Sequence, residues 1–173
     1  MAVMVKPLED NARNEIIHKY NNNWILWTHL PNDDWSFHSY KKIITIETVE
    51  QALSLFENFP ENIIKNSMLF LMKDGIKPIW EDELNKDGGC FSYKVNNKLV
   101  NDLFKKMAYV LMGENLASPE INKLINGITI SPKKNFCIIK IWFSTCQFDN
   151  PDIIYNFESL NKIGCLFKKH ISY

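Results

Sequence analysis

The stretch KDGIKPIWEDELNKDGG, residues 73–89, decides how the rest of the chain can be arranged. Asp74-Gly75 near its start is turn chemistry, and Pro78 excludes a central strand or the interior of a helix. Trp80 therefore lies on a loop, with Glu81 directly after it. Because residues 85–89 are again turn-forming, the stretch predicts a long loop that joins two strands.

Strands are predicted on both sides of this loop. Residues 67–73 form a continuous apolar run that is typical of a buried strand, and residues 90–95 form the next strand. Residues 24–30 and 40–46 are rich in aromatic and β-branched side chains, which also indicates strands. A hairpin-like pair follows at 128–130 and 136–143, and an edge-like strand at 168–173.

Four helices are expected between these strands. Thr48 and Gln51 match a capping box, so a short amphipathic helix begins there and ends near Phe56. The other three are predicted at 99–112, where Gly113 ends the helix, at 119–126 and from Pro151 to Ile163. Short strands interspersed with helices favour an α+β fold with an antiparallel sheet. Helices on one face leave the other face free, where the loop residues Trp35 and Trp80 can converge.

Length and composition indicate one soluble globular domain. The chain has 173 residues, of which 46% are hydrophobic and 23% charged. We expect residues 1–17 to form a flexible N-terminal arm and residues 18–173 to form the domain. Without a signal-peptide core or an apolar run long enough to span a membrane, the sequence predicts a cytoplasmic protein.

The charged residues restrict what the chain can bind. Twenty Lys and Arg balance twenty Asp and Glu, so overall charge alone cannot hold a long polyanion. Only Arg13 is an arginine, and any phosphate site must therefore be built from lysine ammonium groups. Richness in Asn, Ile and Lys fits an AT-rich genome and indicates a viral or parasite source.

Neither histidines nor cysteines form a pattern that carries catalysis. The histidines lie in no Ser, Cys or metal motif: His18, His29, His38 and His170. The cysteines are far apart, with no C-x-x-C pair: Cys90, Cys137, Cys146 and Cys165. The sequence therefore predicts no enzyme, no metal site and no cofactor.

The two loop tryptophans point to a ligand. Trp35 follows two aspartates and Trp80 precedes Glu81 and Asp82, a setting that a buried indole does not need. Two facing indoles can sandwich a flat ring and prefer a cationic one. A neighbouring carboxylate can accept the N–H donors of a purine edge, and nearby lysines can meet phosphates. These residue types together specify a cationic purine that carries a polyphosphate.

Residues 73–89 resemble the K-D-G-I-x-P-x-W-E-D-x-x-N-x-x-G-G signature of the translation initiation factor 4E family of mRNA cap-binding proteins. Supporting matches run in the family's order from about His18 to Tyr173: Trp24-x-x-Trp27, Trp35, Thr48-Val49-Glu50, Leu111-Met112-Gly113-Glu114 and Ile139-Lys140-Ile141-Trp142. The resemblance implies a curved antiparallel sheet with three main helices on its convex face and the cap slot on the concave face. It also implies a factor that binds capped mRNA and promotes translation initiation.

The resemblance also assigns site residues. It implies that Trp35 and Trp80 sandwich 7-methylguanine, that Glu81 binds the guanine edge and that Trp142 lies near the N7-methyl group. Where the family has an Arg and a Lys for the cap phosphates, this chain offers a different set: Lys133, Lys134 and, in place of Ile138, Lys140. Alternatively, Lys133 and Lys134 form only a solvated turn.

A second surface is implied on the helical face. The family binds a 4G-type initiation scaffold there, and the matching positions are His18, Val49, Leu53 and Gly113. Leu53 stands where the family has a tryptophan, so an adapted partner is one possibility and a core role for Leu53 another. Outside the initiation complex the chain is expected to be a monomer. Two alternatives stay open, a cap-binding translational repressor and an interaction module that has lost cap binding.

Overall fold

The computed structural model describes residues 16–29 and 34–170, so residues 1–15 of the predicted arm lie outside the described part. Its centre is one seven-stranded sheet in the order β2-β1-β3-β5-β6-β4-β7, with every neighbouring pair antiparallel. The strands are β1 Lys19–His29, β2 Tyr40–Thr48, β3 Leu69–Lys73, β4 Gly89–Asn96, β5 Ile125–Pro132, β6 Phe136–Phe143 and β7 Leu166–Lys169. The prediction of an α+β fold with a curved antiparallel sheet is confirmed.

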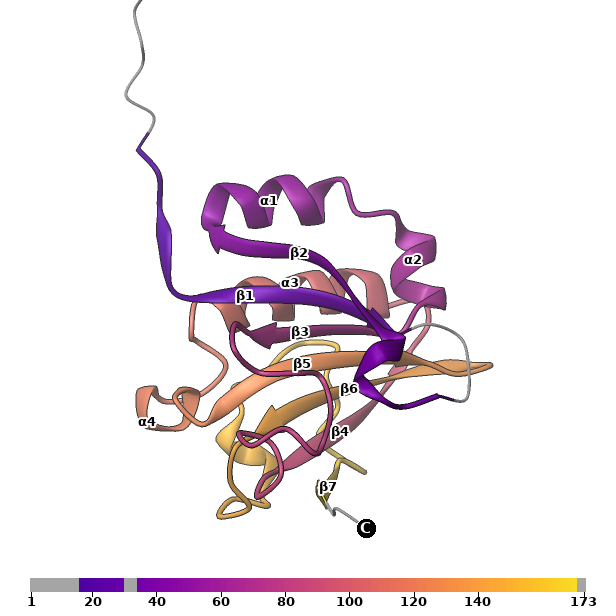
Figure 1. Cartoon of the computed structure of the whole chain (residues 1–173). Helices are drawn as coiled ribbons and strands as arrows, with labels where there is room; N and C mark the ends of the chain where they lie inside the picture. The colour runs from indigo at the N-terminus through magenta and orange to yellow at the C-terminus, as the bar shows by residue number, and fades with distance from the viewer. Residues whose placement is uncertain (1–15, 30–33, 171–173) are drawn as a thin grey trace, which may run out of the picture.

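Helices cover one face of the sheet. They are α1 Val49–Glu57, α2 Glu61–Asn66, α3 Val100–Met112 and the single turn α4 Pro119–Asn122, with the 3-10 turns η1 Phe37–Ser39 and η2 Pro151–Ile153. In Figure 1, α3 lies behind the sheet, whereas the segment that joins β3 to β4 crosses in front of it. No helix of the described ranges is long and apolar enough to span a bilayer.

Alternation along the strands separates two apolar clusters. The larger cluster lies under the helices and takes one set of alternate residues, such as Leu71, Ile128 and Ile139. The smaller cluster lies on the opposite, concave face: Tyr40, Phe70, Met72, Ile76, Cys90 and Trp142. The concave face is therefore only partly filled by apolar side chains and has room for a ligand.

Several element boundaries differ from the expectation. The capping box is present, because Thr48 Oγ1 accepts from Gln51 N at 3.2 Å and Gln51 Oε1 accepts from Thr48 N at 3.2 Å. Gly113 is the C-cap of α3 with φ −78°, and the left-handed residue is Glu114 with φ 54°. The helix predicted for 119–126 lasts one turn, because Ile125 already pairs with Phe143 in the sheet. Helix α2 was missed.

The predicted helix from Pro151 to Ile163 was wrong. Only η2 forms there, and the chain continues without regular structure to β7. Ile154, Phe157 and Leu160 are buried in the main core, whereas Ile163 is 89% exposed. Buried residues three apart suit an irregular segment as well as a helix. Asn161 favours the former, since its Oδ1 accepts from Ile163 N at 2.8 Å in a local turn.

Candidate functional site

A cavity of about 380 Å³ opens on the concave face of the sheet. Its walls come from the segment before β2, from the β3–β4 loop and from strands β2, β3, β5 and β6. The residues that line it are Trp35, Tyr40, Met68, Phe70, Pro78, Ile79, Trp80, Glu81, Thr129, Ser131, Lys133, Lys140 and Trp142. The structure thus gathers six of the seven residues predicted for the cap site, and the exception is Lys134, which is exposed and does not line the cavity.

Trp35 is held in place although it is 57% exposed. The imidazole of His29 stacks on its ring at a centroid distance of 4.2 Å and an angle of 10°. Ser36 donates to both oxygens of the Asp34 carboxylate, from its N at 2.8 Å and its Oγ at 2.9 Å, which lowers the pKa of Asp34. One face of the indole is thus covered, and the residue before it is fixed by a local turn.

Trp80 sits on a loop that is rigid because its own polar side chains bridge it. Asn85 Nδ2 donates to Lys77 O and to Ile79 O, both at 2.9 Å. Asp82 Oδ2 accepts from Lys77 N at 3.1 Å. Asn126 of β5 donates to Asn85 Oδ1 at 2.9 Å and ties the loop to the sheet. The signature residues Asn85 and Asp82 therefore position Trp80 instead of contacting the cavity.

His170, the residue directly after β7, supports Trp80. The sequence analysis did not predict this role. Its ring stacks on Trp80 at 5.5 Å and 15°, and it packs against Trp142 at 4.7 Å. Its Nδ1 lies 2.7 Å from Asn85 O, and its backbone N donates to Gly88 O at 2.9 Å. Burial lowers the pKa of His170 and favours the neutral ring.

Glu81 provides the negative charge of the cavity. Its side chain is exposed at the rim, and it accepts no hydrogen bond from the described residues. Tyr40 lies close enough to sense it, because burial first and then the charge of Glu81 raise the pKa of Tyr40 to about 12. The carboxylate is therefore free to accept N–H donors from a ligand.

The floor of the cavity is polar at two strand positions that sequence reasoning missed, Thr129 and Ser131. Thr129 Oγ1 and Trp142 Nε1 are buried and find no hydrogen-bond partner among the described residues. Thr129 and Ser131 are two residues apart on β5, so their side chains share one face of the sheet. Thr129 pairs with Lys140, and this alternation could have placed both hydroxyls on the face that carries Lys140.

Two lysines add positive charge to the same cavity. Lys133 stands at the start of the β5–β6 turn, where its N donates to Phe136 O at 2.7 Å. Lys140 projects from β6, and its Nζ lies 5.7 Å from the centroid of the Trp80 ring. The cavity thus combines three indoles, one carboxylate and two ammonium groups. Among the described residues, no cluster of His, Cys, Asp and Glu could hold a metal ion.

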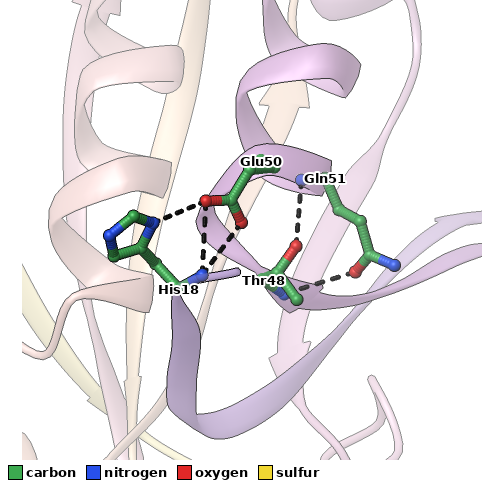
Figure 2. A network of polar contacts seen from close by, with 4 residues as sticks. All are labelled: His18, Thr48, Glu50 and Gln51. Carbon is green, nitrogen blue, oxygen red and sulfur yellow. Dashed lines mark hydrogen bonds and ion pairs between the residues drawn. The ribbon is translucent and has the colours of Figure 1, made fainter. Parts of the chain in front are cut away.

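The second predicted surface lies on the helical side (Figure 2). His18 Nδ1 is 2.7 Å from Glu50 Oε1, and Val49 N donates to His18 O at 2.9 Å. The hydrogen bond from His18 lowers the pKa of Glu50 to about 2. Leu53 is 44% exposed on α1, and Gly113 is exposed at the end of α3. The prediction that Leu53 can offer an exposed apolar group is compatible with this exposure.

Comparison with known proteins identifies relatives of this arrangement. Residues 19–173 match the family described as eukaryotic initiation factor 4E. The eukaryotic translation initiation factor 4E of Candida albicans is 30% identical over 140 residues, which cover 75% of this chain and 66% of that protein. A homologue from Acanthamoeba polyphaga mimivirus is 36% identical over 109 residues, which cover 53% of this chain and 39% of that protein.

A solved structure shows the same architecture. The complex of C. elegans eIF4E-3 with the 4E-binding protein Mextli and cap analog superposes with a TM-score of 0.69 at 25% identity, and the match covers 80% of this chain and 79% of that one. The family match spans most of the sequence, and the antiparallel sheet with its helices matches the fold of that solved structure. The chain belongs to the eukaryotic initiation factor 4E family.

Proposed function

We propose that this chain binds the 7-methylguanosine cap of mRNA in the cavity on its concave face. The observation that carries the proposal is that Trp35, Trp80 and Glu81 line one cavity although they come from two separate loops. Members of the family are cap-binding factors and not enzymes. The solved complex with cap analog supports the same ligand for this chain.

In the proposed mode of binding, the methylated base enters between Trp35 and Trp80. Its positive charge is attracted by the faces of both indoles, since the ring quadrupole is negative there. Glu81 accepts the N–H groups of the guanine edge, and Trp142 lies near the methyl group at the back of the cavity. Stacking contributes about 1–3 kcal/mol per base, and hydrogen bonds to a charged acceptor about 1.5–3 kcal/mol.

Lys133 and Lys140 meet the phosphates in this proposal. An ammonium group acts as a point charge without the fixed fork of arginine, so its contribution is mainly Coulombic and is screened by salt. Lys140 lies against Trp80 and is not in an ion pair with any described carboxylate. Lys134 lies next to Lys133 on the same turn and contributes only long-range charge.

We further propose that the protein acts in translation initiation in the cytoplasm, as a monomer that recruits a 4G-type scaffold or an adapted equivalent through its helical face. His18, Val49, Leu53 and Gly113 would form that contact. Replacing tryptophan by leucine at position 53 shortens the apolar group available to a partner, so a partner helix must reach further. The mimivirus relative supports a viral source.

Retention on an immobilised cap analogue tests the function. The chain should bind the resin and be released by free 7-methyl-GTP but not by the same concentration of GTP. A Leu53→Ala variant should still bind the resin but lose any co-purifying scaffold. Cap binding without a scaffold would favour the alternative of a translational repressor. A chain that is folded but not retained would favour the interaction module.

A further inference from the structure

Beyond the cavity, the concave face continues over β6, β4 and β7, and its charged side chains there are basic. Strand register assigns them to this face. Lys140 pairs with Ser92, Trp142 pairs with Cys90, and Cys90 pairs in turn with Lys168 of β7. Paired residues in an antiparallel sheet point to the same side. Because Trp142 and Cys90 belong to the concave cluster, Lys168 shares their face.

Lys94 belongs to the same surface. It pairs with Ile138, two residues before Lys140 on β6, and its Nζ lies 4.3 Å from the centroid of the Phe136 ring. It is therefore the diagonal neighbour of Lys140, at a Cα separation of about 7–8 Å. The Phe136 ring holds its ammonium group over the sheet. We define Lys94, Lys140 and Lys168 as the lysine track.

The track is continuous with the cavity. Lys140 lines the cavity, and the Nζ atoms of Lys140 and Lys168 lie 5.7 and 5.1 Å from the centroid of Trp80. Both ammonium groups also act on the thiol of Cys90 between them, where they oppose the rise in pKa that burial causes. Positive charge thus extends from the cavity toward the β7 edge of the sheet.

No acidic residue of these three strands interrupts the track. Strands β4, β6 and β7 contain no Asp or Glu, and no described carboxylate forms an ion pair with any of the three lysines. This contrasts with Lys65, Lys86 and Lys162, each of which has an acidic partner. Free ammonium groups on an acid-free sheet face form a surface for a polyanion rather than a solvated network of paired charges.

We propose that the lysine track binds the phosphates of the first nucleotides that follow the cap in a single-stranded mRNA. This rests on the proposed cap function, because the cap fixes where the RNA leaves the cavity. In this proposal the polyphosphate of the cap passes Lys140, and the RNA strand then continues over β4 and β7 past Lys94 and Lys168. Contacts to phosphates carry no sequence information, so the track holds any 5′ sequence.

The test compares two ligands on the same protein, 7-methyl-GTP and a capped ten-nucleotide oligoribonucleotide, each titrated at several salt concentrations. The wild-type protein should bind the oligonucleotide more tightly, and the ratio of the two affinities should fall as salt rises. In the Lys94→Gln, Lys168→Gln double variant, the slope of log K against log salt for the oligonucleotide should be smaller by about 0.7 per lost contact. For the two lost contacts together, a fourfold change in salt corresponds to about a sevenfold change in affinity.

The control is a Lys105→Gln, Lys106→Gln double variant, which removes the same charge from α3 on the opposite face. It should keep the wild-type ratio and slope, which separates the track from overall charge. If wild type binds 7-methyl-GTP and the oligonucleotide equally well, or if the track variant keeps the wild-type slope, the track is overturned and the cap site stands. If 7-methyl-GTP does not bind at all, the proposed function is overturned together with the track.

Discussion

Glu81 differs from the carboxylates beside it in the β3–β4 loop. Asp82 accepts from the backbone N of Lys77 and Leu84, and Glu83 pairs with Lys86, whereas Glu81 accepts no hydrogen bond from the described residues. We predict that Glu81→Gln weakens binding of 7-methyl-GTP by about 1.5–3 kcal/mol, because the charge-assisted bonds to the guanine edge are lost. Fluorescence titration measures this effect. Glu83→Gln is the matched control and should bind as wild type, and equal losses in both variants would contradict the assignment.

His170 gives the fold a dependence on pH. Burial lowers its pKa from the ordinary value of 6.5, so below that value the unfolded chain takes up a proton that the folded chain does not. Stability is therefore fully present above pH 6.5 and decreases as the pH falls from 6.5 toward the lower folded value. We predict that His170→Phe, which keeps the stack on Trp80, removes this decrease.

Thermal unfolding of both proteins between pH 7.5 and pH 5 checks this prediction. Exposed His38 offers the control, since His38→Gln should leave the profile of the wild type unchanged. Identical profiles for the wild type and His170→Phe would show that another group titrates in this range.

Single residues of the site were predictable only where the sequence marks them locally. Trp35, Trp80 and Glu81 stand out by their acidic neighbours and their loop position. His29 and His170 do not stand out, because the role of each depends on the indole on which it stacks. His170 and Trp80 are far apart in the sequence, since Trp80 precedes β4 and His170 follows β7. Lys133 lines the cavity whereas Lys134, the next residue of the same turn, does not, and the two cannot be told apart by their local sequence.

At the scale of elements, the start of α1 depends on the capping box that the sequence predicts. Thr48 and Gln51 satisfy each other's backbone N–H groups at the point where β2 becomes helix (Figure 2). We predict that Thr48→Ala lowers the free energy of unfolding by about 1 kcal/mol. Thr48→Ser should keep most of the stabilisation, because its hydroxyl can still cap the helix. Urea denaturation of the two variants and the wild type measures this difference in the free energy of unfolding. A Thr48→Ala protein as stable as wild type would mean that β2 and β1 alone fix the helix.

The junction of the loop and β4 depends on close backbone approach. A Cβ added at Gly88 would lie 1.8 Å from the backbone oxygen of Phe143, which cannot move without breaking the sheet. We predict that Gly88→Ala destabilises the fold by about 1–3 kcal/mol or more. Gly113→Ala serves as the control, because its φ is ordinary and its nearest neighbour is 3.4 Å away. Equal urea midpoints for the two variants would contradict this account.

Elements with their own local signals could be predicted, and those without could not. The capping box marked the start of α1, and an apolar run next to turn residues, read as one half of a hairpin, marked β6 at Phe136–Phe143. The segment after Pro151 has apolar residues at helical spacing, yet they are buried because the rest of the core surrounds them. That packing exists only in three dimensions, and so the sequence pattern alone suggested a helix.

For the whole molecule, the sheet separates two surfaces. The cavity opens on the concave face, while α1 with Leu53 lies on the helix-covered side (Figure 1). A ligand on one face therefore leaves the other accessible. Zero formal charge does not conflict with a nucleotide ligand, because unpaired lysines gather locally at the cavity and along the lysine track. The antiparallel layout was predictable from short strands and hairpin turns, whereas the curvature that forms the cavity was implied only by the resemblance to the family.

The central claim is that two indoles recognise a positively charged base, and the ratio of the affinities for GTP and 7-methyl-GTP measures it most directly. Calorimetric titration should give a ratio of about tenfold or more for the wild type, because methylation supplies the charge that the indoles attract. In Trp35→Ala and Trp80→Ala, which remove one face of the sandwich each, the ratio should fall toward one while the fold is kept. A wild type that binds both nucleotides equally, or variants that keep the full ratio, would contradict the account.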